Sequence, residues 1–195
     1  MAVITNEMLV ESKKAFLGGD MEAYNATLHP FIRNTVGSME FGGTFLNKRL
    51  NKGNNGGSHR RTTDVFQLAT AVLFQNPIQN FALAPNNLTD APQLCLDFLK
   101  EIPTEWDEVK YIDGYPGKYV VLARRSGDKW YVAAINAEKE TLKLNVDLSF
   151  LGDKTVKWYG DDKNQQPQLT DKKMKSGKPV ALTIDAQGGV VIVAE

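Results

Sequence analysis

The spacing of apolar and polar residues changes near residue 104, from a helical period before it to a strand period after it. Residues 5–17 carry apolar side chains at helical spacing, which predicts an amphipathic helix that Gly18 and Gly19 end. Residues 31–39 follow Pro30 and form a short strand-like run. Residues 42–57 contain too few apolar side chains to pack internally, so they are predicted to form a long loop rich in glycine and asparagine.

Two helices are predicted between residues 62 and 102, and the first of them is expected to be buried. Thr62, Thr63 and Asp64 supply an N-cap candidate and a first-turn carboxylate, and the residues up to Leu73 are apolar nearly all round. A short apolar run over residues 78–83 reads as a strand. The second helix is predicted to begin at Thr89 as N-cap with Pro92 in its first turn, and Pro103 ends it. Its apolar face consists of Cys95, Phe98, Leu99 and Ile102.

After residue 104 the apolar positions recur every second residue. In residues 141–149, four apolar side chains alternate with polar ones, which is typical of a strand with one wet face. Residues 119–125 and 129–137 flank Ser126-Gly127-Asp128 and predict a hairpin, and residues 180–185 and 188–193 predict another across a glycine pair. The polar segment 161–178 is predicted to be a loop or an edge element.

The two periods predict an α+β chain with two parts. Short strands without intervening helices favour an antiparallel β-sandwich in the second part. The strand, loop and helix order of the first part is that of a parallel barrel or a doubly wound sheet, but there is room for only about two such units. Since two units cannot enclose a pocket, we expect the chain to be part of something larger.

Composition narrows the classes of function. The chain has 195 residues, of which 42% are hydrophobic, and its 23 basic and 23 acidic residues leave no net charge. Without a net positive field, nucleic acid and membrane surfaces are not expected as partners. Cys95 is the only cysteine, so an internal disulfide is excluded, and its place in an apolar helix predicts a buried, inert thiol. The first residues carry glutamates where a signal peptide would be positive and then apolar, so this chain shows no targeting signal.

Three segments resemble the C-terminal part of glycoside hydrolase family 97. They are HPFIRNTVGSMEF, RRTTDVFQLA and EWDEVKYIDGYPGKYVVLARRSGDKWYVAAINA. This family comprises bacterial α-glucosidases and α-galactosidases, periplasmic or secreted, with a calcium-dependent (β/α)8 barrel followed by a C-terminal β-sandwich. The resemblance implies that residues 1–103 are the C-terminal remnant of the barrel, with short parallel strands. Residues 104–195 would then be the antiparallel β-sandwich.

The resemblance also implies candidate catalytic and calcium-binding residues. The family pattern has two glutamates six positions apart before the strand, one a calcium ligand and the other the general acid, which can also touch the metal. Glu7 stands at the first position, but Lys13 is six residues on, and the next carboxylate is Glu11. Glu7 and Glu11 are therefore the candidate metal ligands and Glu11 the candidate acid. The alternative is that both are solvated surface glutamates beside Lys13 and Lys14.

The glycine-rich loop ends in a polar cluster that could contact a sugar. His59 and Arg60 could form the rim of a sugar pocket, or they could be a solvated cluster at the start of a helix. The sequence NKGNNGG lacks the lysine and hydroxyl order of a phosphate-binding loop. Trp106, Trp130 and Trp158 all lie in the second part, where they could pack in the core or stack on sugar rings.

Two functions are consistent with these observations. In the first, the chain is part of a calcium-dependent α-glycosidase that hydrolyses terminal α-linked glucose or galactose from oligosaccharides. The second catalytic carboxylate would lie upstream, so the chain alone is expected to be inactive, to bind no calcium tightly and to self-associate through exposed apolar edges. In the second, it is a noncatalytic carbohydrate-binding or scaffold protein derived from the same fold, as the altered glutamate spacing suggests.

Overall fold

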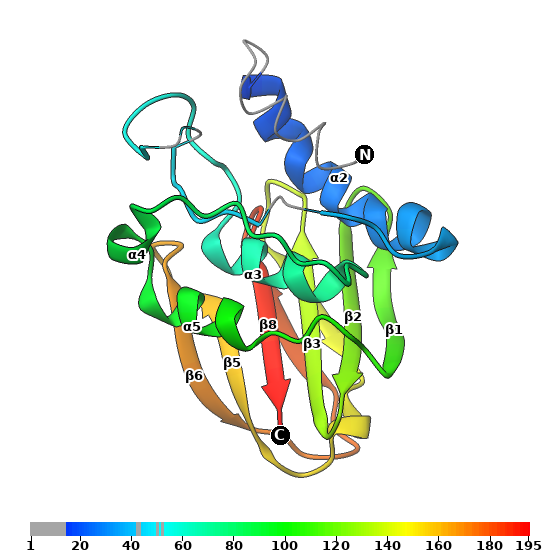
Figure 1. Ribbon diagram of the computed structural model, residues 1–195. Coiled ribbons are helices and arrows are strands. Elements are labelled where there is room, and N and C mark those ends of the chain that lie inside the picture. Colours follow the sequence, from blue (N-terminus) through cyan, green and yellow to red (C-terminus); the bar gives the residue numbers. More distant parts are fainter. Residues whose placement is uncertain (1–14, 42–43, 50, 52) are drawn as a thin grey trace.

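One six-stranded antiparallel sheet forms the centre of the molecule, with helices on one face and a two-stranded sheet on the other (Figure 1). The computed structural model describes residues 15–41, 44–49, 51 and 53–195. The large sheet has the strand order β1-β2-β3-β8-β5-β6, and the small one pairs β4 with β7. This arrangement is α+β with a sandwich-like antiparallel part, as predicted.

The helices and strands have the following bounds. The helices are α2 (Ala15–Val36), α3 (Asp64–Leu73), α4 (Asn87–Asp90), α5 (Gln93–Glu101) and the 3-10 turn η1 (Ser149–Leu151). The strands are β1 (Glu108–Tyr115), β2 (Tyr119–Ser126), β3 (Lys129–Asn136), β4 (Leu142–Val146), β5 (Thr155–Asp161), β6 (Pro167–Lys173), β7 (Val180–Ile184) and β8 (Gly189–Ala194).

The central strands are apolar on both faces because both faces are covered. Along β8, Val191 and Val193 pack against the helices, whereas Val190 and Ile192 pack against the small sheet. Strands β2 and β3 divide their side chains between the two layers in the same way. A continuous apolar run marks a strand buried on both sides, while alternation marks one wet face. The small-sheet strand β4 alternates half-buried and exposed residues, as predicted for residues 141–149.

Helix α3 matches its predicted position. Thr63 is the N-cap and its hydroxyl accepts the Phe66 N–H at 3.1 Å, and all ten helical residues are buried. The hairpin between β2 and β3 also forms across Gly127 and Asp128. Residues 161–178 contain β6, an edge strand of the large sheet, in agreement with the predicted edge element.

The strand predicted over residues 31–39 is wrong, because α2 continues through this segment to Val36. The predicted helix over residues 5–17 lies mostly outside the described residues, but α2 runs through Gly18 and Gly19 instead of ending there. Ala23, Ala26 and Thr27 lie at helical spacing and are buried, so tertiary contacts favour the helix in spite of Pro30. The run over residues 78–83 forms no strand, and only an isolated parallel bridge joins Gln79 to Phe41.

Two further details differ from the prediction. Thr89 is not an N-cap: it lies inside α4, and α5 starts after Pro92. The cause is that a proline disfavours helical backbone in the residue before it, and Ala91 is extended. The predicted hairpin of residues 180–185 and 188–193 does not form either, because β7 pairs with β4 in the small sheet while β8 pairs with β3 and β5. The chain thus crosses from one sheet to the other near the glycine pair.

Candidate functional site

The base of the long loop is attached to the start of α3 by a buried ion cluster. The Asp64 carboxylate accepts hydrogen bonds from the Arg60 guanidinium and, at 2.5 Å, from the Lys48 ammonium. The side chains of Arg60 and Asp64 are both fully buried. Arg60 also donates to the backbone oxygens of Asn47 at 3.0 Å and of Thr62 at 2.8 Å. These bonds attach both ends of the loop to the first turn of the helix.

His59 and Arg60 therefore occupy different environments. His59 is exposed and takes part in an isolated backbone bridge with Arg49, whereas Arg60 is only 8% exposed and bonds to protein atoms. The bonds give Arg60 a structural role whether or not it contacts a sugar. Sugar binding by His59 and Arg60 stays a prediction.

A glutamate that the sequence analysis did not single out contacts the same region. Glu22 in α2 accepts hydrogen bonds from the Gln67 amide at 2.5 Å and from the Thr62 hydroxyl at 3.4 Å. Burial raises the pKa of Glu22, while the Arg60 charge and these hydrogen bonds act against the increase. The sequence signal for this contact was Gln67, a polar residue in the middle of a mostly apolar helix.

A second buried carboxylate links α3 to the sheet. Asp161, at the end of β5, accepts the Thr63 hydroxyl at 2.8 Å and the Gly189 N–H at 3.3 Å. Burial raises the pKa of Asp161 to about 6, although both of these hydrogen bonds lower it. Its other carboxylate oxygen is buried without a partner among the described residues.

The candidate acid and calcium ligands, Glu7 and Glu11, lie outside the described residues. Within the described ranges, no group of three or more His, Cys, Asp or Glu side chains could hold a metal ion. In the same ranges, no helix is both long and apolar enough to cross a membrane.

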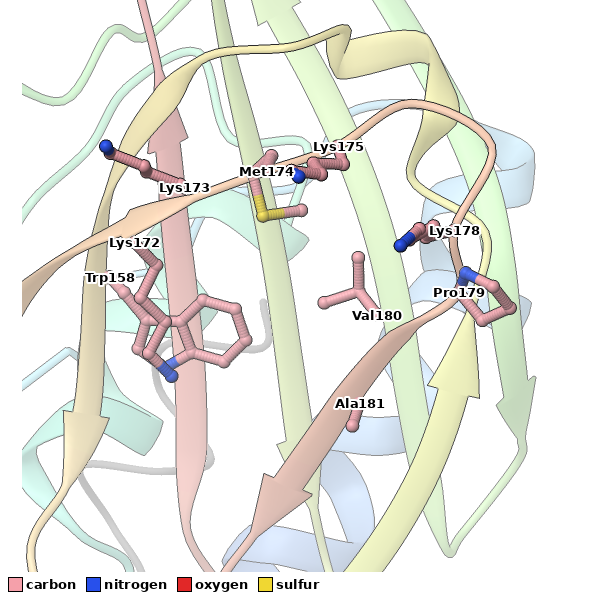
Figure 2. Close-up of a pocket in the computed structure, with 9 residues that line it drawn as sticks. All are labelled: Trp158, Lys172, Lys173, Met174, Lys175, Lys178, Pro179, Val180 and Ala181. Atoms are coloured by element: carbon pink, nitrogen blue, oxygen red, sulfur yellow. The ribbon is translucent and has the colours of Figure 1, made fainter.

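A lysine-lined hollow lies at the open side of the sandwich-like part, far along the chain from the predicted site residues (Figure 2). Its volume is about 310 Å³. The Lys172 ammonium lies 3.5 Å from the centre of the Trp158 ring. The residues lining the hollow are Trp158, Lys172, Lys173, Met174, Lys175, Lys178, Pro179, Val180 and Ala181.

The other two tryptophans are half-buried and pack against the two apolar cores. Trp130 is half-buried and meets Phe150 edge-on, with ring centres 4.8 Å apart. Trp106 meets Tyr131 in the same way at 5.4 Å. These contacts place Trp106 and Trp130 at the edges of the cores, whereas Trp158 borders the hollow described above.

Comparison with known proteins identifies the class. Residues 105–195 match the family model described as glycosyl-hydrolase 97 C-terminal, oligomerisation. The chain is 38% identical over 130 residues to a retaining alpha-galactosidase of Bacteroides thetaiotaomicron, a match that covers 65% of this chain and 19% of that protein. It is 29% identical over 184 residues to a probable retaining alpha-galactosidase of Streptomyces bingchenggensis, covering 88% of this chain and 26% of that protein.

Solved structures give the same class. A beta-arabinopyranosidase crystal structure is 64% identical with a TM-score of 0.87, covering 90% of this chain and 28% of that one. A family 97 enzyme from Pseudoalteromonas sp. strain K8, in complex with acarbose, shares the fold at 24% identity and a TM-score of 0.72, over 88% of this chain and 28% of that one. The class is therefore the C-terminal part of a glycoside hydrolase. Residues 105–195 are a C-terminal domain of glycoside hydrolase family 97, and the chain is similar to the C-terminal part of longer members of that family.

The chain spans about a fifth to a quarter of the length of the curated relatives that it matches. Its matched C-terminal region begins at residue 105, next to the change of period in the sequence.

Proposed function

We propose that this chain is the C-terminal part of a calcium-dependent glycosidase that releases terminal sugars of α-galactose configuration from oligosaccharides. Its similarity to alpha-galactosidases and to a beta-arabinopyranosidase carries the proposal. In the L series, a β-arabinopyranoside has the ring configuration of an α-galactoside without its C6 group. One pocket shape could therefore accept both sugars. Terminal α-linked glucose is the other substrate considered for this family.

In this proposal the first part of the chain completes the barrel of the longer protein. The parallel bridge between Phe41 and Gln79 supports it, because neighbouring strands of a (β/α)8 barrel are parallel. The second part holds the helices against its sheet and takes part in oligomerisation, as the description of the matched family suggests.

The proposed chemistry needs residues of this chain together with residues from the rest of the longer protein. Glycoside hydrolysis uses two carboxyl groups, one protonated at the leaving oxygen and one ionised on the other side of the bond. Glu11 is the proposed acid, Glu7 and Glu11 the proposed calcium ligands, and His59 and Arg60 the proposed sugar contacts. Calcium takes six to eight oxygen ligands, so two glutamates alone do not form a tight site. The chain alone is accordingly proposed to be inactive. An exported location is part of the proposal by family resemblance alone.

The test compares the 195-residue chain with the same chain extended by its upstream coding region. Both are assayed on p-nitrophenyl α-galactoside, β-L-arabinopyranoside and α-glucoside, with calcium or with a chelator. We expect turnover of the first two substrates by the extended protein, loss of activity with the chelator, and no turnover by the shorter chain. Turnover by the shorter chain, or no glycosidase activity in the extended protein, contradicts the proposal.

The second candidate is a noncatalytic carbohydrate-binding or scaffold protein. It is favoured by Lys13, which stands six residues after Glu7 where the family pattern has a glutamate. Extension by an upstream region that lacks paired carboxylates would support this candidate.

A further inference from the structure

The hollow beside Trp158 exists because the two sheets differ in width. The large sheet has six strands and the small one has two, so β4 and β7 cannot cover the whole of its face. The indole of Trp158, from β5, and the side chain of Lys172, from the edge strand β6, meet at this uncovered side. Figure 2 shows them facing Val180 and Ala181 of β7 across the hollow.

The hollow combines an apolar floor with a charged rim. Trp158 is 7% exposed and Met174 is 8% exposed, so both belong to the floor, and Pro179, Val180 and Ala181 form a wall. Its volume of about 310 Å³ lies at the lower end of the range for small-molecule sites, roughly 300–1,000 Å³. A site of this size suits a small ligand such as a sugar.

The rim carries four lysines: Lys172, Lys173, Lys175 and Lys178. Across the described part of the chain, none of them forms an ion pair with a carboxylate. The nearby Asp153 carboxylate accepts the backbone N–H of Ser176 instead. Because the whole chain has no net charge, four lysines around one hollow, none of them in an ion pair among the described residues, are a local concentration of positive charge.

We propose that this hollow binds an acidic sugar, that is, a pyranose that carries a carboxylate or a sulfate. The anionic group pairs with the lysine ammonium groups, and the C–H face of the ring packs on the Trp158 indole. Lys172 now covers that indole through a cation–π contact, and its flexible stem allows the ammonium to turn from the ring to the anion. The residues that line the hollow come from β5, β6, β7 and the segment between β6 and β7, and neither His59 nor Arg60 is among them.

The floor favours a sugar over an acidic peptide. An acidic peptide would pair with exposed lysines along a surface and would need no enclosed indole. A sugar ring uses both features, because its apolar face packs on the aromatic ring while its anionic group reaches the rim.

The test is a binding titration of the 195-residue chain with matched sugars. Digalacturonate carries carboxylates, galactose 6-sulfate carries a sulfate, and galactobiose is a neutral control. Isothermal titration calorimetry measures affinity, and the Trp158 indole N–H signal in an NMR spectrum, assigned with a Trp158→Phe variant, reports on the floor. We expect the acidic sugars to bind at least about tenfold tighter than galactobiose, to lose affinity as salt rises, and to shift the Trp158 signal.

Variants locate the site. Lys172→Met keeps a long apolar stem over Trp158 but removes its charge, and together with Lys175→Met it is expected to weaken binding at least about tenfold. Lys100→Met in α5, on the helical side of the large sheet, is the matched control and should leave affinity unchanged. Since Lys172 and Lys175 are exposed, both variants are expected to fold, which circular dichroism checks.

Four results overturn the proposal. They are absence of binding at millimolar concentration, equal affinity for galactobiose, unchanged affinity in the double lysine variant, and equal binding of a hexaglutamate peptide, which would identify an acidic protein as the occupant. The carboxylated and sulfated sugars distinguish the two sources of negative charge. Since the readout is binding, the outcome does not depend on the hydrolytic activity proposed above.

Discussion

Asp161 is expected to make the folded protein less stable as the pH rises, which is the opposite of the usual effect of a carboxylate. Burial raises its pKa from 3.8 to about 6, so the folded state binds a proton more tightly than the unfolded chain does. Its stabilising contribution is present below pH 4 and is lost as the pH rises through 6. A shift of this size corresponds to at most about 3 kcal/mol. The raised pKa of Glu22 acts in the same direction.

We predict that the Asp161→Asn variant loses less folding stability than the wild type when the pH rises from 4 to 6. Asparagine can still accept the Thr63 hydroxyl and the Gly189 N–H, but it carries no charge to desolvate. Urea unfolding at pH 4, 5, 6 and 7 measures the effect, with Asp171→Asn on the exposed edge strand as control. A variant whose pH profile runs parallel to that of the wild type would show that Asp161 does not titrate in this range.

The Cys95 thiol is predicted to be unreactive in the folded protein. Its side chain is fully buried, and burial, with the nearby Asp64 charge, raises its pKa to about 12. Ellman's reagent should therefore label no thiol in native buffer at pH 8 and one thiol per chain in 6 M guanidinium chloride. Labelling of native protein within seconds would mean that α5 opens far more often than its buried face implies.

Gly189 at the start of β8 is required by the close approach of α3. A Cβ at this position would lie 2.7 Å from the backbone of Phe66 and from the Val65 carbonyl. Those atoms belong to a buried helix and cannot give way. Gly189→Ala is predicted to destabilise the protein by about 2–3 kcal/mol through overpacking.

The matched control for Gly189 is Gly127, in the hairpin between β2 and β3. Its φ is +59°, and a Cβ there meets nothing within 4 Å. Gly127→Ala should therefore cost only the backbone strain of the left-handed conformation, about 1 kcal/mol. Denaturant unfolding compares the two variants, and an equal loss in both would contradict the steric explanation.

Arg60 is predicted to be essential for attaching the long loop to α3. Arg60→Ala leaves the buried Asp64 carboxylate with Lys48 as its remaining side-chain partner and should cost about 3–5 kcal/mol. Arg49→Ala in the same loop removes only a bond to the Gly57 oxygen and should cost less than about 1 kcal/mol. Thermal unfolding of both variants tests this difference. Similar melting temperatures would show that the cluster contributes little to stability.

The sequence predicted those helices and turns that a few neighbouring residues determine. Thr63 caps α3 with its own hydroxyl, and Gly127 turns the hairpin by its own backbone freedom, so a few neighbouring residues decide each structure. Residues 31–36 form helix instead of the predicted strand, since α2 packs on the core through the buried Ala23 and Ala26 before Pro30 and through Phe31 after it. The pairing of β8 with β3 and β5 also depends on distant residues, so a glycine pair could not reveal it.

The same distinction holds for the candidate sites. Cys95 was predicted to be buried because its neighbours are apolar, and it is. Asp161 could not be selected, since its burial depends on α3, which lies far from it along the chain. For Glu22 the sequence offers only the indirect signal of Gln67, which shows a polar position in α3 but not its partner. The hollow at Trp158 depends on the unequal widths of two sheets, which no local pattern encodes.

At the scale of the molecule, the large sheet supports both halves of the chain. One apolar core combines α3 and α5 with inward side chains of β2, β3 and β8, and a second core lies between the sheets. The helices from the first half therefore bury their apolar faces against strands of the second. The domain boundary between residues 103 and 104 stays a prediction. Helices α3 and α5 nevertheless share one apolar core with the large sheet.

The outer face of α2 leaves apolar side chains in solvent. Met21 is 50% exposed, Tyr24 49%, Ile32 61% and Val36 83%, and their spacing places them along one side of the helix. The face continues onto the edge strand β1, because Phe31 meets Tyr111 edge-on with ring centres 6.0 Å apart. The opposite edge strand, β6, carries polar and charged residues that discourage pairing.

This outer face is predicted to cause self-association of the chain in isolation. Large contiguous apolar surface is uncommon on soluble monomers and marks a contact site. Ile32→Glu with Val36→Glu places like charges on the face and should weaken association by at least about tenfold, or roughly 1.4 kcal/mol. Leu169→Glu on β6 is the control, because Leu169 is 42% exposed on the other edge of the sheet and should leave association unchanged. Sedimentation velocity from 10 to 500 µM measures the effect. Two results would exclude the α2 face as the contact: a wild-type chain that stays monomeric throughout, or an equal effect of the α2 substitutions and of Leu169→Glu.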